Sequence, residues 1–541
     1  MHRSSAAGAA VTLLAIAACS NDESPDRSRG EDTGGLASGA TGATGGPMPE
    51  LGGTGGNRSG GGTSSGAAPA TGGSSVGGTG GLPSSGGVTS SGGGPSTGGL
   101  SATGGGGGTG AILTGGSMAA GGEAGTSAGG TAGVPVVETG GSATGGAGGA
   151  SNGASTCHYP PGSEVMNATV PPGFCAWVWA DALGSPRGAT INGAGDLLVV
   201  DSSQDAVVLL YDDDGDGVSG ATERVELANV SGINHGVAIS GGFLYASSET
   251  TIYRWSYSGG RSPLSGESTV VTGLPSGGHR TRTLAFDGSG YLYVSVGSES
   301  NLDDNSDRAR VIRFSPSQLE AGASFGEAEV WGDGTRNEVG LRFDAQGRLW
   351  GVENGSDNLD HPDMGDIHED NPGEEVNLFE QPGAFYGYPD CWSEGLLPSE
   401  FAQGPGTQWA YPSSDVDDAW CRAPANVVPP VMVMQAHSAP LDIIFYSGSS
   451  FPADFVGDAL VSFHGSWNRS AETGYKVVRL PCDDAGMPTG SVEPLLEYSG
   501  SGDTGSDWPH RPVGLAVTPD GKLLVTSDAS GVVIAVGYDG S

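Results

Sequence analysis

At residues 282–297 the chain reads RTLAFDGSGYLYVSVG, which is two short apolar runs separated by Asp-Gly-Ser-Gly. Apolar residues alternate with polar or small ones, and the second run is rich in Tyr and Val, as in a strand with one buried face. Asp and Gly favour the tight turn between the runs. The stretch therefore predicts an antiparallel β-hairpin.

The same pattern recurs along the chain. The copies are Arg187–Asp201, His235–Ser247, Arg282–Gly297, Val339–Glu353, Leu441–His464 and Pro512–Asp528. Most are followed by a further strand, at Val207–Tyr211, Thr251–Tyr257, Arg310–Ser315, Tyr475–Leu480 and Val532–Gly537. Repeated β units of this kind are typical of a β-propeller, so six copies predict an all-β, six-bladed propeller. An irregular sandwich or barrel of hairpins is the alternative.

The chain before the repeats has a different composition. Residues 1–19 have a short basic start and an apolar run that ends in small residues before Cys19, and residues 20–155 are mostly Gly, Ser, Thr and Ala. The first pattern is typical of an export signal. The second offers too little apolar surface to offset the entropy of folding. We therefore expect a disordered linker over 20–155 and a folded domain over 156–541.

Small residues before Cys19 resemble the lipobox of bacterial lipoproteins. That resemblance implies cleavage before Cys19, lipidation of its thiol, and a protein anchored by lipid alone at the outer membrane or cell surface. Ordinary signal cleavage that falls near a cysteine is the alternative.

The other cysteines would lie in an oxidising compartment, where disulfides persist. Cys157 with Cys175 and Cys391 with Cys421 are both plausible pairs, and Cys482 would remain single. The net charge of −39 repels phosphate backbones, which argues against a nucleic-acid partner.

Three strand-entry positions carry candidate functional residues. His279 precedes the third repeat and is flanked by glycines, so it is a candidate general base or else a structural histidine between blades. Arg336-Asn337 and Arg511 precede the fourth and sixth repeats. Basic residues gathered at one mouth of an acidic protein indicate an anionic ligand, because the arginine fork suits carboxylates.

Two acidic stretches are candidate metal sites. Asp212, Asp214 and Asp216 alternate as in the first half of a calcium-binding loop, although a solvated acidic turn is equally compatible. The second stretch, Glu369–Glu375, belongs to a long insertion between Asn354 and Gln435. Long loops on a rigid β scaffold usually carry function.

Several motifs together resemble the soluble PQQ-dependent sugar dehydrogenases, and among them the glucose/L-sorbosone dehydrogenase-like group. They are His279 followed by Thr281–Phe286, Arg336-Asn337, Glu374–Asn377 with Phe385–Pro389, His464–Arg469 with Gly474–Val478, and Arg511–Gly514. The resemblance implies a propeller with pyrroloquinoline quinone (PQQ) across one mouth and a calcium ion beside it. It also implies oxidation of an aldose or aldehyde sugar to the lactone or acid, with hydride passing to PQQ.

The resemblance further implies roles for single residues. His279 would take the proton from the sugar hydroxyl, and the cofactor would be contacted by Arg336, Asn337, Arg511, His437 and Arg469. The backbone carbonyls of Glu369 and Asp370 would hold the cofactor's calcium ion, and Glu375 would belong to a separate structural calcium site.

No haem-attachment motif occurs in the chain, so electrons would leave to an external acceptor, a cytochrome or a quinone. Two other functions fit the same fold: a calcium-dependent lactonase, and a non-catalytic propeller that binds carbohydrate or protein at the cell surface.

Overall fold

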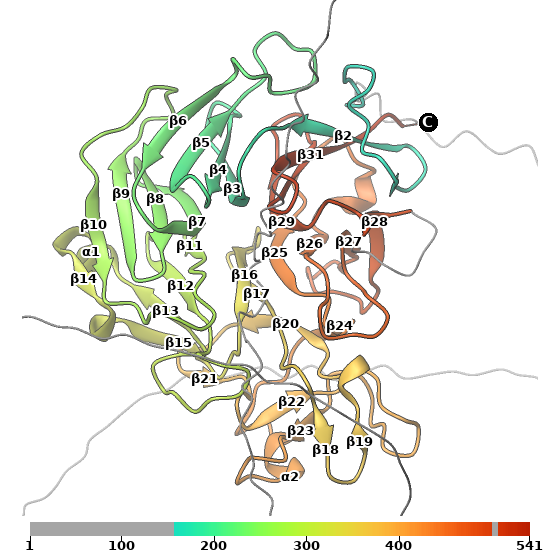
Figure 1. Ribbon diagram of the computed structural model, residues 1–541. Helices are drawn as coiled ribbons and strands as arrows, with labels where there is room; N and C mark the ends of the chain where they lie inside the picture. The colour runs from blue at the N-terminus through green and yellow to red at the C-terminus, as the bar shows by residue number, and fades with distance from the viewer. Residues whose placement is uncertain (1–155, 500–506, 541) are drawn as a thin grey trace, which may run out of the picture. The chain divides into compact units, whose positions relative to one another are not determined.

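The computed structural model of the chain describes residues 156–499 and 507–540. The expected export signal, the lipidated Cys19 and the expected linker over 20–155 lie outside these residues. Within them, six sheets of four or five strands are arranged around a common axis, so the predicted six-bladed propeller is confirmed (Figure 1). No helix of the described residues is both long and apolar enough to span a bilayer.

Each blade runs from an inner strand outward and ends, in some blades, with a short edge strand. Blade 1 consists of β3 (Pro186–Ile191), β4 (Leu197–Asp201), β5 (Ala206–Leu210) and β6 (Arg224–Asn229). Blade 2 consists of β7 (Ile233–Ser240), β8 (Phe243–Ser248), β9 (Thr251–Ser256), β10 (Ser268–Thr272) and β14 (Ala323–Ser324). Blade 3 consists of β11 (Leu284–Phe286), β12 (Leu292–Val296), β13 (Arg310–Phe314), β15 (Glu329–Asp333) and β21 (Ala384–Phe385). Blade 4 consists of β16 (Glu338–Phe343), β17 (Leu349–Glu353), β20 (Glu374–Phe379) and β24 (Met432–Met434). Blade 5 consists of β25 (Pro440–Phe445), β26 (Ala459–Phe463), β27 (Lys476–Leu480), β28 (Glu493–Tyr498) and β1 (Ala168–Thr169). Blade 6 consists of β29 (Pro512–Val517), β30 (Leu523–Ser527), β31 (Val532–Tyr538) and β2 (Phe174–Ala180).

Each sequence repeat forms the inner hairpin of one blade. The turn between β11 and β12 shows why. One carboxylate oxygen of Asp287 accepts hydrogen bonds from the backbone N–H groups of Ser289 at 2.8 Å and Tyr291 at 2.9 Å. Gly290 follows with a φ of 84°, a conformation that glycine adopts without steric cost. Asp344 makes the same pair of bonds in blade 4, to Gln346 and Arg348.

The inner strands pack tightly around the axis through one equivalent position in each blade. These six positions, which we call the axial ring, are Arg187, His235, Arg282, Val339, Leu441 and Val513. Glycine follows four of them because the next blade leaves no room. A Cβ on Gly188 would lie 2.2 Å from the carbonyl oxygen of His235, and one on Gly514 would lie 2.4 Å from that of Arg187. Half of the axial ring is basic, whereas Val339, Leu441 and Val513 form one apolar cluster.

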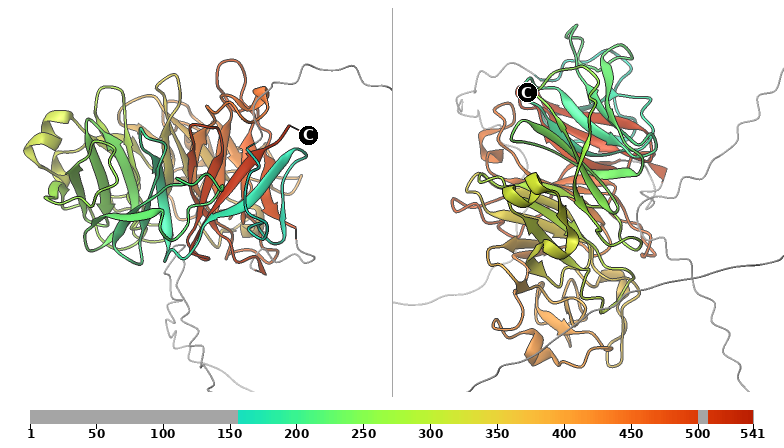
Figure 2. Two further views of the ribbon diagram at one scale, coloured as in Figure 1. Left: turned by 90° about the horizontal axis from the view of Figure 1, so that it is seen from above. Right: turned by 90° about the vertical axis from the view of Figure 1, so that its left-hand side faces the viewer.

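The ring of blades is closed by the two ends of the described chain. Strand β2 pairs with β31 in the last blade, and the two lie side by side in Figure 2. The Cys157–Cys175 disulfide fixes the segment that leads into β2.

The insertion lies on both sides of blade 4's third strand, β20, in the sequence and contains its own small core. Its elements are β18 (Asp360–His361), β19 (Gly365–Asp366), β22 (Cys391–Ser393), β23 (Gln408–Ala410) and α2 (Asp418–Cys421). Trp392 and Trp409 stack with ring centroids 6.1 Å apart. The Cys391–Cys421 disulfide joins β22 to α2. Both disulfides are therefore the pairs that the sequence made plausible, and Cys482 is the single cysteine of the described chain.

Candidate active site at one mouth of the propeller

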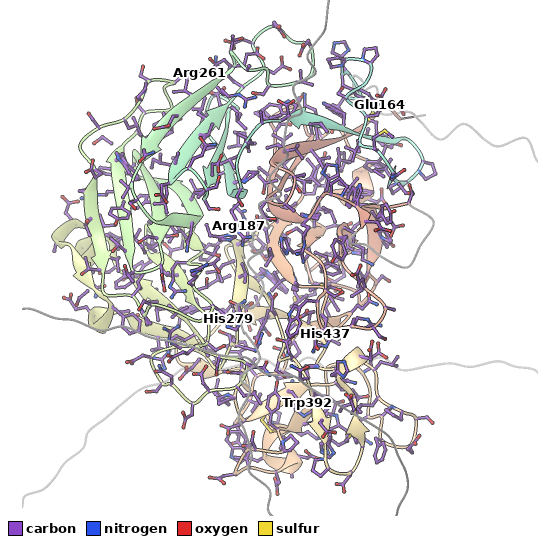
Figure 3. The ribbon with its side chains drawn as sticks, in the orientation of Figure 1. Glu164, Arg187, Arg261, His279, Trp392 and His437 are labelled. Atoms are coloured by element: carbon purple, nitrogen blue, oxygen red, sulfur yellow. A yellow bond between two sulfur atoms is a disulfide. The ribbon has the colours of Figure 1, made fainter. Side chains whose placement is uncertain are left out.

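The candidate residues gather where the inner strands begin. His279, Arg336, His437 and Arg511 all precede the inner strand of a blade, so the topology brings them to one mouth of the channel. Figure 3 labels Arg187 near the middle of the ring of blades, His279 and His437 between it and Trp392 of the insertion, and Arg261 at the rim.

His279 is held by the end of the neighbouring strand in its own blade. Its Nδ1 lies 3.1 Å from the carbonyl oxygen and 2.9 Å from the hydroxyl oxygen of Ser298, while the Ser298 hydroxyl itself donates to the carbonyl of Ser300 at 2.8 Å. A carbonyl oxygen only accepts, so Nδ1 carries the proton. The lone pair of a neutral His279 is therefore on Nε2, which is the nitrogen that can take a proton.

Burial sets the protonation state of this histidine. Burial and the nearby Arg336 guanidinium lower the pKa of His279 to about 3, because both disfavour the imidazolium form. At neutral pH the ring is consequently an unprotonated base.

Asn337 lies beside His279 because of a glycine between them. A Cβ on Gly297 would lie 2.5 Å from the Cβ of His279 and 2.7 Å from Oδ1 of Asn337. The expected base and one expected cofactor ligand are thus neighbours, and any side chain at position 297 would separate them.

Arg336 is bonded to protein on every side. Its guanidinium donates to both oxygens of Asn301, to the carbonyl of Asn354 at 3.2 Å, and to the Asp357 carboxylate at 3.1 Å. The residue is only 2% exposed. Arg336 therefore lies at the expected mouth, but in this structure its bonds organise the loop after β17.

Arg511 differs from Arg336 in its surroundings. Its guanidinium donates to the carbonyls of His464 at 3.0 Å and Gly465 at 2.8 Å and stacks on the Tyr475 ring. The ion pairs found among residues 156–499 and 507–540 do not include Arg511. Its partly exposed guanidinium donates to carbonyl oxygens and to no carboxylate of the described residues, which suits an anionic ligand.

A buried charged network missed by the sequence reasoning lies next to Arg511. Arg187 donates to one oxygen of Asp528 at 2.5 Å, and Nε2 of His464 donates to the other at 2.9 Å. Burial lowers the pKa of His464 and also opposes ionisation of Asp528, yet the hydrogen bond from His464 and the Arg187 guanidinium hold the pKa of Asp528 well below its usual range. The signal was available, since Arg187 occupies the axial-ring position of the first repeat.

His437 and Arg469 both bond to the insertion's short helical turn at His368–Asp370. The Nε2 of His437 donates to the carbonyl of His368 at 2.5 Å, and Nδ1 lies 3.6 Å from the Asp357 carboxylate. Arg469 donates to the carbonyl of Glu369 and to the carboxylate of Asp370. His437 thereby links the insertion to the loop that holds Arg336.

The carbonyls expected to hold calcium already have donors. The carbonyl of Glu369 accepts from Arg469, and that of Asp370 accepts from the backbone N–H of Leu396 at 3.2 Å. A guanidinium is thus found at one of the two oxygens assigned to the cation. The two carbonyls do not form a ready calcium site in this arrangement.

Glu375 belongs to a buried acidic cluster in blade 4. The amide of Asn377 donates to Glu338, Glu353 and Glu375 at 3.2–3.4 Å. Burial raises the pKa of Glu375 to about 7 and raises those of Glu338 and Glu353 well above their usual range. Sequence reasoning missed Glu338 and Glu353, which start β16 and end β17 and therefore face each other.

The acidic loop of blade 1 lies far from this mouth's histidines in sequence and forms its own cluster. Carboxylate oxygens of Asp212, Asp214 and Asp216 lie within 4.8 Å of one another, and these side chains are partly or fully exposed. Among the described residues, no other three His, Cys, Asp or Glu side chains bring their ligand atoms within this distance of one another.

The propeller is similar in sequence to known proteins. A family profile described as TrAA12-like matches residues 168–539. A pyrroloquinoline quinone-dependent pyranose dehydrogenase from Coprinopsis cinerea is 32% identical over 392 residues, which cover 65% of this chain and 52% of that protein. The chain therefore spans about half the length of that relative. A pyrroloquinoline quinone-dependent sugar dehydrogenase from Hypocrea jecorina is 30% identical over 410 residues, which cover 69% of this chain and 90% of that protein.

Two solved structures are similar over the same region. One is the calcium structure of a Trichoderma reesei protein of Carbohydrate-Active Enzymes Family AA12, with a TM-score of 0.63, 30% identity, and coverage of 69% of this chain and 98% of that one. The other is the holo form of the pyranose dehydrogenase PQQ domain from Coprinopsis cinerea, with a TM-score of 0.62, 30% identity, and coverage of 70% and 99%.

Proposed function

The chain belongs to the TrAA12-like family, and from that membership we propose that it oxidises an aldose or aldehyde sugar with PQQ as the hydride acceptor. The single observation that supports the proposal is the His279–Ser298 contact, because it leaves Nε2 as the basic nitrogen of a neutral His279. The relatives named as PQQ-dependent sugar and pyranose dehydrogenases support the choice of reaction.

The proposed role of His279 follows from its tautomer. When the sugar carbon gives up a hydride, the hydroxyl on that carbon must also lose its proton. In this proposal Nε2 of His279 is the base that accepts the proton. Ser298 keeps Nδ1–H bonded throughout, so the ring keeps its orientation as it becomes charged. Such a base contributes a factor of about 10²–10⁴ to the rate.

The donors at this mouth fit the proposed cofactor. PQQ, when bound, supplies the quinone that accepts hydride, and its carboxylates require cations. Arg511 offers a guanidinium that is not ion-paired to a described carboxylate, and Asn337 offers an amide beside His279. We propose that Arg511 and Asn337 are the main contacts of the cofactor. His437 and Arg469, which bond to the insertion, would contact it from that side.

Calcium is a separate part of the proposal. Because the carbonyls of Glu369 and Asp370 accept bonds from Arg469 and Leu396, we derive no step through a metal at that place. The cation sites predicted at Glu375 and at the Asp212–Asp216 loop stay predictions.

The product would be the lactone or acid, and an external acceptor, a cytochrome or a quinone, would reoxidise the cofactor. We also propose that the domain works outside the cytoplasm, held by the lipid anchor predicted at Cys19. The two disulfides support an oxidising compartment.

The test is dye reduction by the purified chain supplied with PQQ and a panel of aldoses, compared with His279→Ala. The proposal expects reduction by the wild type and none above background by the variant. Hydrolysis of a lactone without quinone would replace it with the lactonase function. Sugar binding with no reduction by any aldose would replace it with the binding module.

A further inference from the structure

The loop that carries His279 is folded around two buried arginines. Its carbonyls point inward, and Arg282, the axial-ring residue of blade 3, is fully buried beneath them. One terminal nitrogen of Arg282 donates to the carbonyls of His279 at 2.8 Å and Thr281 at 2.6 Å, and the other donates to that of Pro275.

Arg308 completes the arrangement from the loop that precedes β13. It is 4% exposed and donates to the carbonyls of Gly277 at 3.0 Å and Ser276. Five carbonyls of the seven-residue segment 275–281 are therefore bonded to two guanidiniums, which we call the guanidinium pair.

The other side of the segment is equally fixed. The backbone N–H of Gly277 donates to the Glu249 carboxylate, and that of His279 donates to the carbonyl of Ser298 at 2.9 Å. A Cβ on Gly278 would lie 2.5 Å from the backbone of Glu299, so the segment is in direct contact with the residues after β12.

Burying two positively charged guanidiniums close together is electrostatically unfavourable. Burial and the adjacent Arg308 lower the pKa of Arg282 to about 9. Among the ion pairs of the described residues Arg282 has none, and the contact of Arg308 with Glu299 is 3.9 Å long. In some proteins a buried charge of this kind is retained because its hydrogen bonds specify one conformation.

We propose that Arg282 and Arg308 are positioning residues that hold the His279 segment in the one backbone conformation in which Nδ1 meets Ser298. The proposal rests on the proposed role of His279 as the base. Lysine cannot replace either residue, because an ammonium on a flexible stem does not span two carbonyls as the planar fork does.

The experiment compares the full-length wild type with Arg308→Lys and Arg282→Lys, without quinone or sugar. Hydrogen exchange at the imidazole C2 position, followed by mass spectrometry, reports the pKa of each histidine, and amide exchange reports the mobility of segment 275–281. Arg313→Lys is the matched control, because Arg313 is in the same blade but pairs with Glu329 on the outer strands.

The proposal expects amide exchange in segment 275–281 to rise at least tenfold in Arg308→Lys, and the exchange midpoint of His279 to move upward toward an ordinary histidine. The melting temperature and exchange elsewhere should match Arg313→Lys. An unchanged His279 profile overturns the proposal. Destabilisation of the whole chain in both Arg308→Lys and Arg282→Lys also overturns it, since the arginines would then be general structural residues.

Dye reduction separates this inference from the proposed function. A chain that reduces no dye with any sugar fails the function, while the exchange measurements still test the positioning. In an active enzyme, Arg308→Lys should lower kcat at least tenfold and change KM and the quinone affinity less than threefold.

Discussion

Nδ1 of His279 lies 3.1 Å from the carbonyl oxygen of Ser298, and this contact fixes which nitrogen of the imidazole can act as a base. The serine hydroxyl, bonded onward to Ser300, adds a second acceptor. Two neutral oxygens therefore accept at Nδ1 of His279.

Replacing His279 with asparagine should remove the proton acceptor and keep the shape of the loop. We expect kcat for sugar oxidation to fall by about 10²–10⁴ with quinone affinity unchanged within threefold. Steady-state dye reduction and a quinone titration measure the two quantities. A variant that keeps more than a tenth of the wild-type kcat would exclude His279 as the base.

The same histidine predicts an unusual pH profile. Since burial and Arg336 lower the pKa of His279 to about 3, the ring stays unprotonated far below the ordinary value of 6.5. The acid limb of kcat/KM should therefore lie below pH 5, with the rate nearly constant between pH 5 and pH 7. Stopped-time assays in overlapping buffers give the profile. A limb centred near pH 6.5 would show a solvated histidine instead.

Arg511 should contribute to cofactor affinity more than to stability. Its guanidinium bonds only to carbonyls and is half-buried, so Arg511→Ala should weaken quinone binding by about 10- to 100-fold, the loss of one charge-assisted contact worth roughly 1.5–3 kcal/mol. Urea unfolding should show a much smaller change. If the quinone dissociation constant is unaffected, the cofactor assignment at this mouth is wrong.

Arg336, in contrast, should contribute to stability more than to cofactor affinity. Arg336→Ala leaves the buried Asp357 carboxylate without its guanidinium, which costs about 3–5 kcal/mol of unfolding free energy. Chemical denaturation measures this loss. The double variant Arg336→Met, Asp357→Asn removes both charges and should recover part of it, whereas equal losses in the single and double variants would contradict the ion-pair explanation.

The Cys391–Cys421 bridge should stabilise the insertion. It closes a loop with a sequence separation of 30, for which chain entropy gives about 3–4 kcal/mol. Replacing both cysteines with serine should lower the unfolding midpoint under non-reducing conditions. Cys482→Ser is the control, because Cys482 forms no disulfide. Equal midpoints for the two variants would mean that the bridge adds no stability.

Much of the fold was readable because the repeats carry their own periodicity. Each predicted copy is one inner hairpin, and the blade order follows from chain order. The hairpin register even brings His279 close to Ser298, since Leu284 pairs with Val294 and the strands extend toward both residues.

Contacts between blades could not be read in this way. Arg187 and Asp528 are 341 positions apart, and they meet only because the ring closes between the first and last blades. The placement of Arg469 on the carbonyl of Glu369 likewise depends on how the insertion folds back to blade 5. Neither periodicity nor local turn chemistry specifies where such a loop packs.

The most direct test of the proposed function is an absorbance titration of PQQ into the purified protein, followed by addition of an aldose. We predict a saturable change in the quinone spectrum with one quinone per chain, weakened in Arg511→Ala, and bleaching of the bound quinone when sugar is added. A spectrum that does not change with added protein, or bound quinone that no aldose bleaches, would contradict the account.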